Sequence, residues 1–436
     1  MQFFQELGSL VEKRWRDQSY NEEVFPEVAA AALGEMTLGK HVSPWDIIRW
    51  LHQTSQLPEQ RDVEGRFGDP PITLYDGSRF YIDVYYWLDG TTSIHQHAFC
   101  GAFQVLTGSS ILSQYGFDES RRINAHFLAG KMNLNKVELL EQGDIRQIFP
   151  GRQYIHSLFH LDRPSVSIIV RTNQSPSGLP QYNYHKPYFA IDPFLREQSM
   201  IKRVQSVSLL LSMKHPEADE IIGDLLSCSD FHTAFSVLDI AFNTLPNDPL
   251  ERAFGLSTGK QRFEALFEIV RRRHGELADL ILPVLEEVRR QQNLIQRRGQ
   301  ITSNEHRFFL ALLLNVPDRA KIVELVRQRF PEQDPVDTIT EWVDELANTK
   351  VAGSSEPNVL GIHNYGEDYL FVFQCLLEGL TPEGIKAAFE EEFSVKDAPD
   401  LGSKPEELCD AIRNSILFQS IFVDSQSALT ASQSIV

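Results

Sequence analysis

The sequence has few cysteines and no closely spaced pair of them. Its 436 residues contain four, all far apart: Cys100, Cys228, Cys375 and Cys409. This usage argues against a disulfide framework and is typical of reduced thiols in a cytoplasm. The first residues, MQFFQELGSLVEKRW, place charged side chains inside their apolar stretch and lack the apolar core of a secretory signal peptide. We therefore expect a cytoplasmic protein.

Basic residues and long apolar runs are also scarce. Lysine and arginine together number 41, against 60 aspartates and glutamates, so the formal net charge is -19. Nucleic acids and anionic membrane surfaces are bound through basic patches, and neither is expected as a partner. No stretch of about 18 uncharged apolar residues occurs, which argues against a membrane-spanning helix.

Four regions with different residue patterns follow one another along the chain. Residues 1–70 have helical spacing of apolar residues and predict an N-terminal helical segment. Residues 71–176 contain short alternating stretches such as RFYIDVYYW, which predict a small antiparallel β-barrel or sandwich. Residues 177–190 are rich in turn formers and predict a linker, and residues 191–436 predict an all-α domain. The expected fold class is a multidomain α+β protein.

Histidines are concentrated in the predicted β region. Six of the thirteen lie between residues 95 and 185. Because residues i and i+2 of a strand point to the same face, His95 and His97 can both point into a barrel. A third metal ligand would then come from another strand, where His156 and, less directly, His160 are available. The alternative is that these imidazoles are hydrogen-bonded groups of a sandwich core without a metal.

The order of these motifs resembles that of the cupin superfamily, and more closely that of its thiol dioxygenases. GTTSIHQH is followed by FQVLTGSS, then by PGRQYIH and PSVSIIV, so that the likeness covers residues 72–176. The resemblance implies a barrel in which His95, His97 and His156 bind one iron(II) ion through neutral imidazoles. Other divalent metals also suit three imidazoles. The likeness does not extend to the helical regions.

Several positions depart from this family. Many cupins add a glutamate ligand four or five residues after the second histidine, where this chain has Gly101 and Ala102. Ala102 also occupies the place of the cysteine that the cysteine dioxygenases crosslink to a tyrosine. Ser167 matches the serine of their serine–histidine–tyrosine relay, but Ile169 and Arg171 replace the other two members. The resemblance therefore implies a metal cupin whose substrate is not free cysteine.

The expected function is that of a non-haem iron dioxygenase-like oxidoreductase. It would use O2 and a small substrate that carries a thiol, amine or hydroxyl group. Candidate pocket residues are Gln104, Tyr154, Arg171 and Ser167, and His160 is either an alternative ligand or a partner of one. Arg171 could equally lie in solvent at a strand end. The alternative function is a non-catalytic metal- or ligand-binding cupin, whose C-terminal helices bind a protein partner or self-associate.

Overall fold

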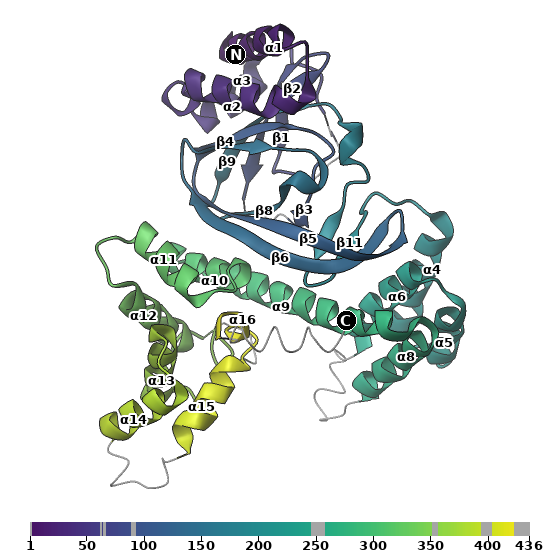
Figure 1. Ribbon diagram of the computed structural model, residues 1–436, viewed down its shortest axis with the longest axis vertical. Coiled ribbons are helices and arrows are strands. Elements are labelled where there is room, and N and C mark those ends of the chain that lie inside the picture. The colour runs from purple at the N-terminus through teal and green to yellow at the C-terminus, as the bar shows by residue number, and fades with distance from the viewer. Residues whose placement is uncertain are drawn as a thin grey trace.

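In the computed structural model, a β-barrel lies between three N-terminal helices and a larger set of C-terminal helices (Figure 1). The structure describes residues 2–61, 63, 67–88, 93–245, 258–350, 356–393 and 403–422. In these ranges no helix combines the length and the apolar character needed to cross a membrane.

The N-terminal helices are α1 (Gln2–Asp17), α2 (Phe25–Met36) and α3 (Pro44–Gln53). The start of α3 is fixed by the Ser43 side chain, which accepts a hydrogen bond from the backbone, and by Asp46, which binds back to the Ser43 amide. Apolar residues of these helices share one core with the strands beneath them. The helical segment expected before residue 70 is present, and it covers one face of the barrel (Figure 1).

The strands form two layers. Within each layer, neighbouring strands pair in antiparallel orientation. In the first layer the order is β1 (Pro71–Asp76), β2 (Phe80–Trp87), β9 (Ser165–Thr172), β4 (Gly101–Thr107) and β7 (Ile145–Ile148). The second layer closes on itself, in the order β10 (Asn183–His185), β11 (Phe189–Ile191), β6 (Phe127–Leu140), β5 (Ser110–Asn124), β8 (Ile155–His160) and β3 (Ile94–His95). The predicted antiparallel β-barrel between two helical regions is confirmed.

Alternation along β2 separates two environments. Ile82 and Val84 point outward into the core shared with the N-terminal helices. Tyr85 and Trp87 point inward and pack with aromatic and aliphatic residues of the barrel interior. Since successive side chains of a strand alternate between faces, Asp83 must share the inward face. One face of β2 therefore packs against the N-terminal helices, and the other face forms part of the wall of the barrel interior.

The segment predicted to be a linker, 177–190, belongs instead to the barrel. Strand β10 pairs with β3 and with β11, and β11 pairs with β6, so these short strands complete the closed layer. The prediction was wrong here because the turn-forming residues hide strands of only three residues. Their pairing partners lie far away in the sequence, and local composition gives little sign of such strands.

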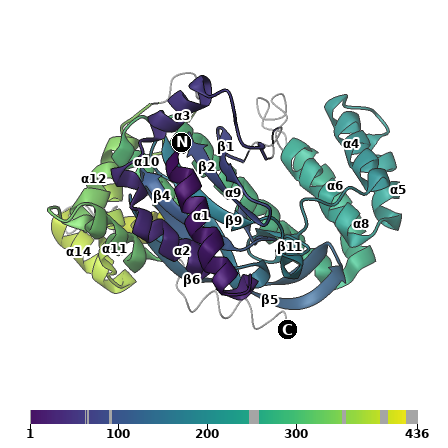
Figure 2. The same cartoon turned by 90° about the horizontal axis from the view of Figure 1, so that it is seen from above.

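The C-terminal region is helical, as predicted. Its helices are α4 (Gln198–Ser212), α5 (Ala218–Cys228), α6 (Phe231–Thr244), α8 (Thr258–His274), α9 (Ile281–Gly299), α10 (Asn304–Asn315), α11 (Arg319–Arg329), α12 (Pro335–Ala347), α13 (Glu367–Glu378), α14 (Pro382–Glu392), α15 (Lys404–Arg413) and α16 (Gln419–Phe422). They lie in two groups on opposite sides, and α9 runs along the barrel between them (Figures 1 and 2).

Helix α9 is fixed directly to the barrel. The guanidinium of Arg298 donates hydrogen bonds to the carbonyl oxygens of His160 and Leu161, at the end of β8, over 3.2 and 3.1 Å. Apolar residues of β5, β6 and β8 share one core with the helices that follow α9. The helical region therefore packs against the same strand that carries His156.

Candidate metal centre

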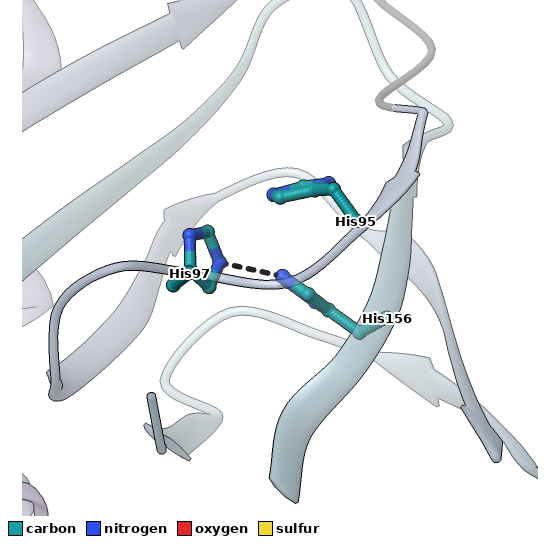
Figure 3. Close-up of side chains that lie close together, drawn as sticks. All are labelled: His95, His97 and His156. Carbon is teal, nitrogen blue, oxygen red and sulfur yellow. Dashed lines mark hydrogen bonds between the residues drawn. The ribbon is translucent and has the colours of Figure 1, made fainter. Parts of the chain in front are cut away.

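Three histidines meet at the barrel wall. His95 lies in β3 opposite His156 in β8, and His97 follows two residues later in a bridge to Pro150. Their rings face a common point (Figure 3), and one nitrogen of each lies within 4.8 Å of the others. The two nearest nitrogens, His97 Nε2 and His156 Nε2, are 2.8 Å apart. The sequence predicted this trio, and the β3–β8 pairing brings it together.

The hydrogen bond of His95 fixes which ring nitrogen is free. Its Nδ1 lies 2.7 Å from the carbonyl oxygen of Ser93. A carbonyl oxygen can only accept, so Nδ1 carries the proton and Nε2 keeps its lone pair. That Nε2 is buried and has no hydrogen-bond partner. Metal-binding histidines are commonly oriented in this way by a bond from the other ring nitrogen.

All three imidazoles are held in the neutral form. Burial lowers the pKa of His95, although its bond to the Ser93 carbonyl opposes this effect. Burial also lowers the pKa values of His97 and His156 far below the usual range, and neighbouring histidines add to the effect. Arg171 contributes further to the lowered pKa of His97. At neutral pH the site therefore offers lone pairs rather than positive charge, which is the form that binds metals.

These residues fit a divalent metal ion. Two imidazole nitrogens bound at right angles to one ion, each at about 2.0–2.1 Å, would be roughly 3 Å apart. The 2.8 Å between His97 and His156 is close to that spacing. Among the residues that the structure describes, no carboxylate or thiol joins the group. The site can therefore hold a metal through three imidazoles alone, and this donor set suits iron, zinc, copper and nickel.

The histidines line a cavity of about 50 Å³. Typical small-molecule pockets have volumes of about 300–1,000 Å³, so this cavity admits only a compact ligand. Apart from the histidines its walls are mainly aromatic and aliphatic: Phe67, Tyr85, Trp87, Phe99, Phe103, Ile148, Leu158, Ser167, Ile169 and Arg171.

Two of the four predicted pocket residues line this cavity. Ser167 accepts a hydrogen bond of 3.1 Å from Trp87 Nε1, and Arg171 stacks its guanidinium on Phe99 at 3.3 Å from the ring centre. Tyr154 does not line the cavity. Its ring packs against His156 with the centroids 4.5 Å apart, and burial raises the pKa of its phenol.

Gln104 was wrongly assigned to the pocket. Phe103 faces the cavity, and strand alternation turns the next side chain to the other face. There the Gln104 amide donates a hydrogen bond of 3.1 Å to the carbonyl oxygen of Gly143, in the turn between β6 and β7.

His160 shares the inward face of β8 but lies outside the ligand group. Its ring stacks on Trp87 with the centroids 4.4 Å apart, and its Nδ1 lies 3.0 Å from the Ser110 hydroxyl. Burial, with a contribution from Arg298, lowers its pKa to about 3. His160 is therefore a neutral residue that supports Trp87, rather than an alternative ligand in this geometry.

Some residues of the site were not singled out from the sequence. Tyr85 and Trp87 could have been found, because the alternation along 80–87 puts them on one face. Phe67 had no such sign: it precedes the first strand, yet its ring packs edge-on against Tyr85, Trp87 and His95. Gly90, at the start of the histidine motif, lies outside the described residues.

No protein-family model and no curated protein matches the chain. Among solved structures, the TT1209 protein of Thermus thermophilus is 16% identical, with a TM-score of 0.19 over 27% of this chain and 100% of its own. A Klebsiella pneumoniae protein with a double-stranded β-helix domain is 14% identical, with a TM-score of 0.18 over 29% and 87%. The polyketide cyclase RemF of Streptomyces resistomycificus is 17% identical, with a TM-score of 0.19 over 30% and 77%. Likenesses this weak do not bear on the chemistry of the chain.

Proposed function

We propose that this protein is a metal-dependent cupin with the activity of a non-haem iron dioxygenase. Iron(II) is the first candidate metal, and the substrate is a small thiol, amine or alcohol other than free cysteine. The observation that carries the proposal is the convergence of three buried, neutral imidazoles at the wall of a cavity. The order of the histidine motifs, which resembles that of the thiol dioxygenases, supports iron and oxygen chemistry.

The residues of the chain have definable tasks in this proposal. A bound ferrous ion would supply open coordination positions for the substrate and O2, and the electrons needed to activate oxygen. The Ser93 carbonyl orients the His95 ring, and burial keeps the imidazoles of His97 and His156 in the neutral form. The aromatic and aliphatic walls exclude bulk water, which protects reactive species from side reactions.

A second candidate is a barrel that binds a metal or small ligand without turning it over, with the C-terminal helices binding a protein partner. The small volume of the cavity, about 50 Å³, favours it, because little space remains for a substrate beside the metal. Oxygen consumption distinguishes the two candidates.

The test combines metal analysis with oxygen consumption. Protein purified and loaded with iron(II) without air would be assayed for metal content, then for O2 uptake with a panel of small thiols, amines and hydroxy acids. The enzyme proposal expects about one iron per chain, and substrate-dependent uptake that is lost in His97→Ala. Bound metal without uptake would favour the second candidate. Failure of the wild type to bind any divalent metal would overturn the metal centre.

A further inference from the structure

Arg171 is placed beside the candidate metal ligands. It lies near the end of β9, where it pairs in register with Tyr81 of β2 and Gly101 of β4. Its guanidinium carbon is 3.3 Å from the centre of the Phe99 ring, and the Phe99 and His97 ring centres are 4.3 Å apart. The Phe99 ring therefore lies between the Arg171 guanidinium and the His97 imidazole, and it contacts both.

Arg171 forms no salt bridge with an acidic side chain among the described residues. Its Nε is buried and makes no hydrogen bond. Asp83 interacts electrostatically with Arg171 but forms no salt bridge with it: its Oδ2 accepts a bond from the Tyr85 hydroxyl at 3.1 Å, and its Oδ1 is unpartnered. Arg171 is half-buried and its buried Nε lacks an acceptor, so an anion that binds the guanidinium would gain a charge-assisted hydrogen bond.

Arg171 and Phe99 also separate two hollows. Both line the histidine cavity, and both line a larger hollow of about 760 Å³. The larger hollow has mixed walls that include Asn173, Gln181 and the exposed ring of Phe194. Among the residues that line the smaller cavity, Arg171 is the only arginine, and there is no lysine, aspartate or glutamate.

We infer that Arg171 binds the anionic end of the ligand, so that the substrate class is that of compact carboxylic acids with a second donor group. The carboxylate lies on the guanidinium at the boundary of the two hollows, and the thiol, amine or hydroxyl group faces the histidines. A guanidinium suits a carboxylate because its planar N–H groups match both oxygens. This inference rests on the proposed metal centre, and it specifies in addition that the substrate carries a negative charge.

The test uses cobalt(II), whose visible spectrum reports on ligands that approach the metal. Glycolate, an acid with a hydroxyl donor, and glycolamide, its neutral counterpart, would be titrated into the cobalt-loaded protein. Wild type should bind glycolate about 10- to 100-fold more tightly than glycolamide, the range expected of a charge-assisted pair. Arg171→Gln should take up cobalt normally but lose this preference, and Arg171→Lys should recover part of it.

The matched control is Arg152→Gln, which removes an arginine that lies over Phe117 and pairs with Glu119 away from the cavity. It should leave the preference unchanged, and melting curves should show that every variant is folded. Equal affinities of wild type for the two probes, or an unchanged preference in Arg171→Gln, would overturn the inference while leaving the metal centre intact. A wild type that takes up no cobalt would overturn the metal centre, and this inference with it.

Discussion

The β-barrel contains most of the buried polar atoms that lack hydrogen-bond partners, whereas in the C-terminal helices most comparable groups are paired. Of thirteen such atoms among the described residues, eleven lie between residues 83 and 175. They include His95 Nε2 and Arg171 Nε at the cavity, together with Asp83 Oδ1 on the strand face that points into the barrel. Folded proteins pair nearly all buried polar groups, so a cluster of exceptions needs a reason.

The helical region shows that this chain can satisfy buried charge. Four arginines there are almost fully buried, and each donates to at least one backbone carbonyl: Arg290, Arg297, Arg298 and Arg307. Their guanidinium groups tie helices to one another and to the barrel. We propose that the unpartnered groups at the cavity are kept available for a ligand at a cost in stability, while the paired arginines in the helices serve stability.

The largest expected effect comes from removing one metal ligand. His97→Ala should lose most of the bound metal, because the three-histidine group has no spare protein ligand. With chelator the variant and wild type should melt alike. Iron(II) at a hundred to a thousand times the dissociation constant should stabilise only wild type, by roughly 3–4 kcal/mol. A lower melting temperature of the variant in chelator, with no response to iron in either protein, would instead make these histidines structural.

Truncating a paired arginine should affect stability more than truncating an unpaired one. Arg298→Ala removes the buried hydrogen bonds to the carbonyls of His160, Leu161 and Arg307. We expect a loss of about 2–4 kcal/mol in the free energy of unfolding. Arg171→Gln should change it by less than about 1 kcal/mol, because no hydrogen bond is lost. Urea denaturation of both variants tests this, and equal losses would remove the contrast between the two regions.

His160 should make stability depend on pH. Its folded pKa of about 3 is below the usual value of 6.5, so the unfolded chain takes up the proton first as the pH falls. Stability should therefore decrease below pH 6.5 and continue to decrease towards pH 3, with His160 contributing about 1.4 kcal/mol per pH unit. Urea denaturation in chelator between pH 7 and 5 should give a shallower slope for His160→Gln than for wild type. Parallel slopes would mean that His160 is protonated in the folded protein.

The smallest effect should come from Ser167. Ser167→Ala removes the acceptor of the Trp87 Nε1 hydrogen bond, which should cost about 1 kcal/mol. Metal content should not change, because Ser167 lines the cavity without belonging to the ligand group. Loss of metal in this variant would show that Ser167 or Trp87 helps to hold the histidines in place.

The sequence by itself determined the types of the elements and the three ligand candidates. Alternating aromatic and β-branched residues specify strands, and apolar residues at helical spacing specify helices. The His-x-His pair can be recognised because residues i and i+2 of a strand lie on the same face. These properties depend on neighbours within a few residues, so they can be read without the fold. Ser167 and Arg171 could be predicted as pocket residues in the same way, because both lie on the same face of β9.

Only the tertiary structure decided which of these residues meet. The pairing of β3 with β8 brings His95 to His156, and the short strands within residues 183–191 close the barrel although their composition resembles a linker. Gln104 was assigned to the wrong face, and Phe67 reaches the cavity from outside the strands. The physical reason is that long-range pairing and burial are set by contacts between distant segments, and these contacts leave little trace in the local pattern that a sequence shows.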